Sequence, residues 1–226
     1  MPDRLIAIGD IHGCLAALRS VLDATAPGTD DTIVTLGDYI DRGPDSRGVI
    51  DCLIRLQASC RLVPLLGNHD ELLIDIYNGR ADLLADWLLF GGNATLASYG
   101  TLKPETIPEE HIEFLENCLL YFETEKHIFL HGTYDPALPL ERQTLQMLLW
   151  DKIRPTPPGP HCSGKTVILG HTAQRNGQIL DLGHLKCIDT CCYGEGYLTA
   201  LDIQSGQIWQ ADKEGRMRDQ GMRDEG

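Results

Sequence analysis

The chain has 226 residues, with 19 basic and 33 acidic side chains and a net charge of −14. This length suits one sizeable α/β domain rather than two, and the acidic balance excludes a surface that coats nucleic acid, which needs clustered lysine and arginine. No apolar run reaches the length of a membrane span, so no membrane partner is expected.

The start of the chain and its cysteines bear on where the protein resides. The first ten residues, MPDRLIAIGD, contain a short apolar stretch without a small-residue cleavage site. They are therefore predicted to begin a strand rather than a signal peptide. The eight cysteines are scattered along the chain, and without a signal peptide they are interpreted as reduced, mostly buried thiols. Both observations favour a cytoplasmic protein.

The first third of the chain alternates predicted strands with predicted helices. The strands are expected over 4–9, 31–37 and 61–67, and the helices that follow them over 14–25, about 45–58 and about 70–78. This alternation predicts neighbouring parallel strands joined by right-handed crossovers.

The remainder of the chain is predicted to become rich in β-structure. Residues 80–106 are expected to form an irregular insertion near the active site, and 108–120 a helix. Six strand-like runs follow, over 127–132, 166–171, 177–182, 184–190, 197–203 and 206–211. The spacing of the last four predicts an antiparallel block. The polar tail, 213–226, is expected to be disordered, which leaves a single domain over 1–212.

Polar side chains of a restricted kind follow the predicted strands. They are Asp10 and His12 after the first strand, Asp38, Asp41 and Arg42 after the second, Asn68, His69 and Asp70 after the third, and His131 and His171 after two later strands. In an open α/β sheet, ligands bind at the edge formed by the carboxyl ends of the strands. Carboxylate, amide and imidazole ligands together suit borderline divalent ions such as manganese, iron or zinc. The pattern therefore predicts a dinuclear metal site.

The order and spacing of these motifs resemble those of the metallophosphoesterase superfamily. GDIHG and GDYIDRG are separated by 23 residues, and another 23 residues lead to GNHD. Within the superfamily, the chain is most similar to the phosphoprotein phosphatases of the compact bacterial and phage type. The resemblance extends over roughly residues 4–210 and includes WLLFGGNATLASYG (87–100) and LKCIDTCCYGEGYLTALDI (185–203). Five short motifs in one order are far more specific than any one of them alone.

The resemblance implies the fold and the metal ligands. The expected fold is an α/β (α+β) sandwich of two β-sheets flanked by helices, with two metal ions, manganese being the first expectation, at the sheet edge. One metal would be held by Asp10, His12 and Asp38. The second metal would be held by Asp38, Asn68, His131 and His171, so that Asp38 bridges the two ions.

The resemblance also implies the reaction, which is hydrolysis of a phosphoprotein or phosphopeptide by direct attack of a metal-bridging hydroxide. His69 would be the general acid that protonates the leaving alkoxide, and Asp41 would orient it. Arg42 would clamp the substrate phosphate, because its guanidinium fork matches phosphate oxygens. Asn68 would lie beside the phosphate as well.

The chain departs from the family pattern at several positions. Asp70 stands where eukaryotic members have glutamate, and Leu66 stands where they have a phosphate-binding arginine. A second family arginine follows an LLW-like segment, where this chain offers Arg154, with Lys152 as the alternative. Cys191 replaces the glycine of an IDTG motif, which either narrows the pocket or is tolerated if its φ is negative.

Two other functions remain open. A diadenosine-polyphosphate hydrolase of the same superfamily is favoured by GNHD and by the missing arginine, but that branch generally lacks the residue that is Asp41 here. A metal-binding module that recognises phosphorylated partners without turnover is disfavoured because all the proposed ligands, the acid and its carboxylate are present.

The segment GPHCSGKT (159–166) matches the pattern of a nucleotide-binding phosphate loop. Such a loop follows a strand and opens a helix, whereas here a proline-rich segment precedes it and a predicted strand follows. It is therefore interpreted as a surface loop.

Overall fold

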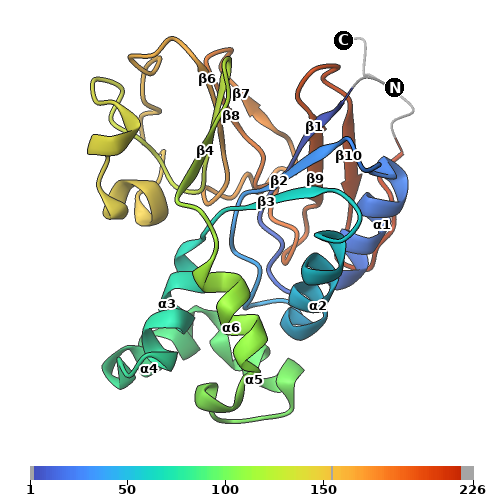
Figure 1. Cartoon of the computed structure of the whole chain (residues 1–226), viewed down its shortest axis with the longest axis vertical. Helices are drawn as coiled ribbons and strands as arrows, with labels where there is room; N and C mark the ends of the chain where they lie inside the picture. Colours follow the sequence, from blue (N-terminus) through green and yellow to red (C-terminus); the bar gives the residue numbers. More distant parts are fainter. Residues whose placement is uncertain (1–2, 154, 220–226) are drawn as a thin grey trace.

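The computed structural model describes residues 3–153 and 155–219, and it contains two five-stranded sheets packed face to face with helices outside them (Figure 1). The strands are β1 (Leu5–Ile8), β2 (Thr32–Thr35), β3 (Arg61–Pro64), β4 (Tyr121–Glu123), β5 (His127–Leu130), β6 (Thr166–Leu169), β7 (Leu180–Asp181), β8 (Leu185–Cys187), β9 (Leu198–Asp202) and β10 (Ile208–Ala211). The α-helices are α1 (Leu15–Thr25), α2 (Ser46–Leu56), α3 (Asn68–Tyr77), α4 (Leu84–Trp87), α5 (Asn93–Tyr99) and α6 (Glu109–Glu116). The predicted two-sheet α/β sandwich is confirmed.

The two sheets have the same plan, with a parallel core and antiparallel strands added to it. The first sheet has the order β10-β9-β1-β2-β3, and the second has the order β4-β5-β6-β8-β7. β1, β2 and β3 are parallel to one another, as are β5, β6 and β8. The carboxyl ends of the three parallel strands in each sheet therefore lie at one edge, as the βα alternation predicts for the first sheet.

The alternation of side chains along β1 explains how the layers pack. Ile6 and Ile8 point to one face, where they pack in a cluster with residues of α1 and α2. Ala7 points to the other face, into the core between the two sheets, with Val34 and Phe129. Successive residues of a strand face opposite sides of a sheet, so a strand that is apolar throughout is buried on both faces.

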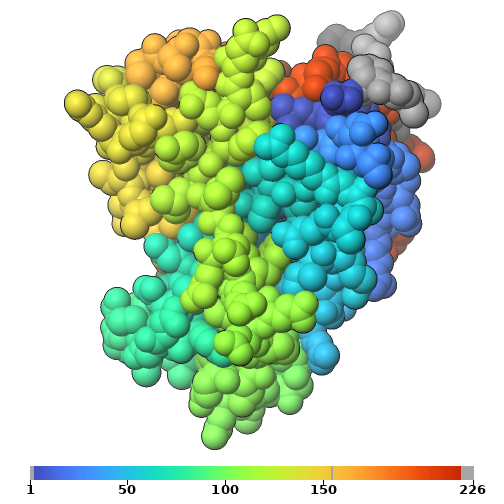
Figure 2. Space-filling model, viewed as in Figure 1, coloured from blue at the N-terminus to red at the C-terminus, as the bar shows by residue number. Residues whose placement is uncertain are grey.

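The helices gather at two places. α1 and α2 cover the outer face of the first sheet, and α3, α4, α5 and α6 lie together below the sheets in Figure 1. The space-filling view shows the same lower lobe in green, built largely from the segment around residues 80–116 (Figure 2). α2 begins where the side chain of Asp45 accepts a hydrogen bond from the backbone N–H of Gly48 at 2.8 Å, which is a typical N-terminal cap.

The segment 80–106 is largely helical, so the prediction of an irregular insertion is wrong. It contains α4, a wider helical turn over Leu88–Gly92, α5, and short 3₁₀ turns at Ala81–Leu83 and Pro104–Thr106. Gly91, with φ of 118°, separates the turn of α4 from α5. Helices this short do not repeat their apolar positions often enough to show a helical period in the sequence.

The last four strands form two hairpins rather than one antiparallel block. β7 pairs with β8 in the second sheet, whereas β9 pairs with β10 in the first sheet. The spacing of the runs predicts which neighbours pair, but it carries no information about the sheet that each hairpin joins. β4 is a further antiparallel strand that the sequence did not suggest.

The part of the tail that the structure describes, 213–219, is hydrogen-bonded to the domain, unlike the expected disordered tail. Arg218 donates from its backbone N–H to the carbonyl of Gln210 at 2.8 Å, and the hydroxyl of Ser20 donates to the carbonyl of Gly215 at 2.7 Å. Residues 220–226 lie outside the described residues. No helix in the described ranges is long and apolar enough to cross a bilayer.

Candidate metal centre

The predicted ligand residues meet at the edge formed by the carboxyl ends of five parallel strands. Asp10 and His12 follow β1, Asp38 follows β2, Asn68 and His69 open α3 after β3, His131 follows β5, and His171 follows β6. All these side chains are buried except that of His171, which is partly exposed. Strands from both sheets therefore contribute to one cluster.

Asp38 is the centre of this cluster. Its Oδ2 lies 3.3 Å from Nε2 of His12, and its Oδ1 lies 3.4 Å from Nε2 of His131. Two sets of donor atoms are close enough to hold a metal ion. One comprises His12, Asp38 and His69, and so contains His69 where Asp10 was expected. The other comprises Asp38, His131 and His171, which were all expected. Because Asp38 belongs to both sets, the arrangement suits two ions that share one carboxylate.

Backbone carbonyls orient the three imidazoles around Asp38. The Nδ1 of His12 lies 2.9 Å from the carbonyl of Ile40, and the Nδ1 of His131 lies 2.7 Å from that of Leu36. His171 uses its Nε2 instead, at 2.8 Å from the carbonyl of Trp150. A ring N–H that donates to a carbonyl leaves the other nitrogen as the one that carries the lone pair, which is the usual support of a ligating histidine.

Burial sets the charge of the ligand residues. It lowers the pKa of His12 and His131, and it lowers that of His171 to about 4. Burial also raises the pKa of Asp10, and repulsion from the neighbouring carboxylates of Asp189 and Asp38 raises it further. Because the imidazoles are neutral, they do not offset the charge of the buried carboxylates beside them. Bound divalent cations would offset that charge. The donor set therefore fits a dinuclear site of borderline metals.

Asn68 and Asp10 join the cluster in different ways. The Oδ1 of Asn68 lies 3.1 Å from Nε2 of His131, which brings an amide oxygen to the second set of donors. The two carboxylate oxygens of Asp10 accept from the backbone N–H of His171 at 3.1 and 2.9 Å. Asp10 thus links the loops that follow β1 and β6, one from each sheet.

His69 and Asp41 form a buried pair beside the cluster. The Nδ1 of His69 lies 2.7 Å from Oδ2 of Asp41, and the two residues are 2% and 0% exposed. The other ring nitrogen, Nε2, lies 4.0 Å from Oδ2 of Asp38. The structure therefore places one edge of His69 against a carboxylate and the other toward the metal ligands.

Arg42 lies over the outer side of the same cluster. Its guanidinium donates to Nε2 of His12 at 2.8 Å and lies over the ring of Tyr193, 4.5 Å from the centroid. A guanidinium stacked on an aromatic face still presents its N–H edge to acceptors, and in Arg42 one group of that edge is bonded to His12. Tyr193 was not among the predicted site residues.

The cluster lies at the bottom of a cleft of about 540 Å³. Its lining comprises Asp38, Arg42, Asn68, His69, Phe90, Trp150, Lys152, His171, Thr172, Ala173, Arg175 and Tyr193. Lys152 and Arg175 are exposed, and among the described residues neither forms an ion pair. The cleft therefore offers three cations in a protein of net charge −14. The predicted Arg154 lies outside the described residues.

Some of these residues carry little signal in the sequence. Arg175 lies four positions after His171, so its nearness to a motif was the available clue. Phe90 comes from the helical insertion, and its ring lies 6.4 Å from that of His69. Cys191 adopts φ of 64°, so the expectation that a negative φ lets it replace glycine does not hold.

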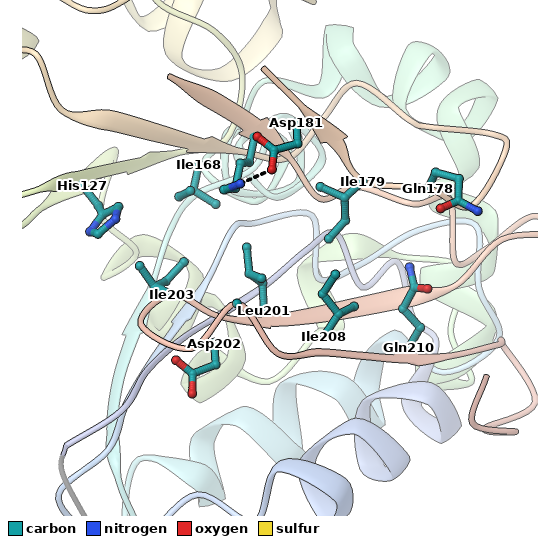
Figure 3. Close-up of a pocket in the computed structure, with 12 residues that line it drawn as sticks. His127, Ile168, Gln178, Ile179, Asp181, Leu201, Asp202, Ile203, Ile208 and Gln210 are labelled. Carbon is teal, nitrogen blue, oxygen red and sulfur yellow. Dashed lines mark hydrogen bonds and ion pairs between the residues drawn. The ribbon is translucent and has the colours of Figure 1, made fainter. Parts of the chain in front are cut away.

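A second cavity, of about 430 Å³, lies at the other edge of the sandwich (Figure 3). His127, which lines it, begins β5, whereas His131 of the metal cluster follows β5. Ile203 and Ile208 border it from the hairpin of β9 and β10, and Lys186 pairs with Asp181 at its rim. It contains none of the predicted site residues.

The loop over 159–165, which matches a phosphate-loop pattern, precedes β6 and opens no helix. Lys165 donates to Glu123 at 2.8 Å and to the carbonyl of Thr124 at 2.7 Å. Its ammonium is thus engaged on the surface, as the inverted order of the elements predicts.

Comparison with known proteins identifies the family. The model of the calcineurin-like phosphoesterases matches residues 3–185. A serine/threonine-protein phosphatase 1 of Salmonella typhimurium is 30% identical over 208 residues, which cover 87% of this chain and 90% of that protein. A symmetrical bis(5'-nucleosyl)-tetraphosphatase of Nitrosospira multiformis is 26% identical over 267 residues, which cover 92% of this chain and 95% of that protein.

Solved structures agree with the fold. A crystal structure provisionally named a diadenosine tetraphosphatase has a TM-score of 0.69 and 26% identity, and the match covers 92% of this chain and 93% of that one. A cold-active protein-tyrosine phosphatase of a Shewanella species has a TM-score of 0.63 at 15% identity, over 96% of this chain and 82% of that one. The chain belongs to the calcineurin-like phosphoesterase family of metal-dependent hydrolases.

Proposed function

We propose that the protein is a serine/threonine protein phosphatase, and the observation that carries this proposal is the pair formed by His69 and Asp41. The two side chains lie 2.7 Å apart at the edge of the metal cluster. A serine or threonine alkoxide is a poor leaving group, so its departure needs a proton donor. A phosphoanhydride releases a more stable anion and depends less on such a donor.

The chain's own residues provide two metal sites in this proposal. Asp10, His12 and Asp38 would hold one ion, and Asp38, Asn68, His131 and His171 would hold the other, with manganese as the expected metal. When bound, such ions lower the pKa of water and offset the charge of the phosphoryl oxygens. The neutral state of His12, His131 and His171 keeps their lone pairs available at neutral pH.

His69 and Asp41 divide the acid step between them. Nδ1–H of His69 donates to Asp41, which fixes the ring, and the proton on Nε2 passes to the leaving oxygen of the substrate. Arg42 turns its guanidinium to the phosphate oxygens, and the amide of Asn68 lies beside them. A second phosphate contact would come from Arg154, which lies outside the described residues, or from Lys152, which lines the cleft.

Diadenosine-polyphosphate hydrolysis is the second candidate. Lys152 and Arg175 line the cleft beyond Arg42 without ion-pair partners among the described residues, and a chain of several phosphates would use all three cations. The similarity to the tetraphosphatase of Nitrosospira multiformis also supports it.

The two candidates are separated by stripping the metal and restoring it with Mn²⁺. Phosphate release from a phosphoserine peptide is then measured in parallel with cleavage of diadenosine tetraphosphate. Preferential turnover of the peptide is the expected result, and His69→Asn should abolish it while metal content stays near normal. Preferential cleavage of the dinucleotide would establish the second candidate. Metal binding without turnover of either would favour a module that only binds phosphorylated partners.

A further inference from the structure

The segment 84–99, which contains α4, the turn over Leu88–Gly92 and α5, packs against the loop that carries Asp41 and Arg42. The carboxylate of Asp41 accepts from Nε1–H of Trp87 at 2.9 Å and from the hydroxyl of Thr95 at 2.6 Å. Trp87, Thr95 and Asp41 are each 0% exposed. Together with His69, three donors from three elements converge on one buried carboxylate.

These donors divide the two oxygens of Asp41 between them. His69 and Trp87 both lie at Oδ2, whereas Thr95 lies at Oδ1. A carboxylate bonded only to His69 could rotate about its side-chain torsions, and the imidazole would then change its orientation as well. With Oδ1 fixed by Thr95, that rotation breaks a buried hydrogen bond and is therefore unfavourable.

The same segment supports the backbone of the loop. Asp41 and Arg42 adopt φ of 72° and 69°, a conformation that is strained for residues with side chains. The N–H of Asp41 donates to the hydroxyl of Thr95 at 2.9 Å, and that of Arg42 donates to the carbonyl of Gly91 at 3.2 Å. These bonds hold two successive residues in a conformation that they would not adopt alone.

Gly91 allows this close approach. Its φ is 118°, and a Cβ on it would lie 2.8 Å from Cγ of Arg42 and 2.9 Å from the backbone nitrogen of Arg42. A residue with a side chain would therefore push the segment away from the loop. The contact is specific to this backbone, since both the glycine and the hydroxyl of Thr95 are needed to form it.

We infer that Trp87 and Thr95 are positioning residues, which hold Asp41 so that His69 presents its proton to the leaving oxygen. The inference rests on the proposed function, because it assigns a role to the acid step of that reaction. It also gives the segment 84–99 a part in catalysis although Trp87 and Thr95 touch neither the phosphate nor the metal ligands.

The test compares two substrates whose leaving groups differ. A phosphoserine peptide needs proton donation to its leaving alkoxide, whereas p-nitrophenyl phosphate releases an anion that is stable near neutral pH. Thr95→Val removes the hydroxyl with little change of volume, and Trp87→Phe removes the ring N–H. Each variant should lower kcat for the peptide by roughly tenfold or more and change kcat for p-nitrophenyl phosphate by less than about twofold. Thr95→Ser, which keeps the hydroxyl, should restore peptide turnover.

The control within the same helix is Tyr99→Phe. Tyr99 bonds through its hydroxyl to Nδ1 of His111 at 2.7 Å and lies in α5 like Thr95, so the variant also removes one hydrogen bond from the segment. It should leave both rates and the metal content unchanged. His69→Asn is the reference for a lost proton donor and should show the same selectivity for the peptide.

Three outcomes would overturn the inference, and they differ in what else they affect. Equal losses on both substrates in Thr95→Val and Trp87→Phe, while His69→Asn discriminates, would mean that the segment only stabilises the fold. Unchanged peptide turnover in both variants would mean that His69 holds Asp41 unaided. A His69→Asn variant that loses both substrates equally would overturn the acid step of the proposed function and the inference with it.

Discussion

The carboxylate of Asp70 accepts a hydrogen bond from the backbone N–H of Asp38 at 2.8 Å. The same side chain accepts from the N–H of Tyr39 at 3.1 Å and from that of Gly67 at 3.0 Å. Asp38, the residue common to both sets of metal donors, adopts φ of 51°. Its strained backbone turn is therefore stabilised by the hydrogen bonds to Asp70. The aspartate that departs from the glutamate of the eukaryotic pattern thus fixes the backbone of the central metal ligand.

Replacing Asp70 by alanine should therefore weaken both the fold and the metal site. The change leaves three backbone N–H groups without their acceptor in the interior, and we expect a loss of roughly 3–5 kcal/mol in the free energy of unfolding. Urea unfolding of the metal-free protein measures this loss, and elemental analysis measures the metal retained. Asp70→Asn keeps one acceptor oxygen and should lose less; wild-type stability in Asp70→Ala would contradict the role.

Metal stoichiometry should distinguish the shared ligand from an unshared one. Asp38 belongs to both sets of donor atoms, whereas His12 belongs to one. We expect Asp38→Asn to lose both ions on dialysis and His12→Asn to lose one and keep the other. His184→Asn, a histidine outside the cluster whose ring bonds to the carbonyl of Pro158, is the control. Equal metal loss in Asp38→Asn and His12→Asn would show that the sites do not bind independently.

The contribution of the cleft's cations to substrate binding should increase with the number of phosphates in the substrate. Lys152→Ala and Arg175→Ala remove charges that line the cleft without ion-pair partners among the described residues. Together they should raise KM for diadenosine tetraphosphate by up to about tenfold at low salt, less at high salt, and change KM for a phosphoserine peptide less. Lys213→Ala, an exposed cation outside the cleft, is the control. Equal effects on both substrates would exclude a contact beyond the reacting phosphate.

The contribution of His171 to the stability of the metal-free protein should fall as the pH is lowered from about 6.5 toward 4. Burial lowers the pKa of His171 to about 4 in the folded protein, whereas an unfolded histidine has a pKa of about 6.5. The unfolded chain therefore takes up this proton first as the pH falls. The stability that neutral His171 contributes is therefore fully present above about pH 6.5 and is lost as the pH falls through about 4. The loss in the free energy of unfolding is on the order of 3 kcal/mol.

Urea unfolding in the presence of a chelator, at several pH values between 7.5 and 4.5, measures this dependence. The variant His171→Asn should show a shallower decline than the wild type, because it lacks the titrating ring. Identical slopes in the two proteins would show that His171 is not held in its neutral form by the fold.

The ends of the parallel strands could be predicted from the sequence because local signals define them. Four of the five apolar runs stop at a glycine followed by Asp, Asn or His, whereas the run of β5 ends in His131 just before Gly132. The topology brings these ends to one edge. The pair of His69 and Asp41 was expected from the resemblance to the metallophosphoesterases, and the structure places the two side chains 2.7 Å apart.

The partners of Asp41 could not be predicted in the same way. Trp87 and Thr95 lie 46 and 54 residues further along the chain, in helices too short to show a period. Whether a buried tryptophan only packs or also donates a hydrogen bond depends on its tertiary neighbours. The same limit applies to the hairpin of β9 and β10, whose sheet is decided by packing against β1.

The pairing of β1 with β9 sets an order of events during synthesis. Ile6 pairs with Asp202, and Ile8 with Ala200, so β1 lies at the centre of its sheet only after β9, almost 200 residues further along, has been made. Asp10 and His12 follow that strand directly. On the ribosome, the emerging chain therefore holds its earliest metal ligands in an unfinished sheet while His131 and His171 are still being added. Contacts between such distant segments form slowly, so the mature centre assembles after translation has passed β9, and truncated chains that end before it lack the frame that holds the first two ligands.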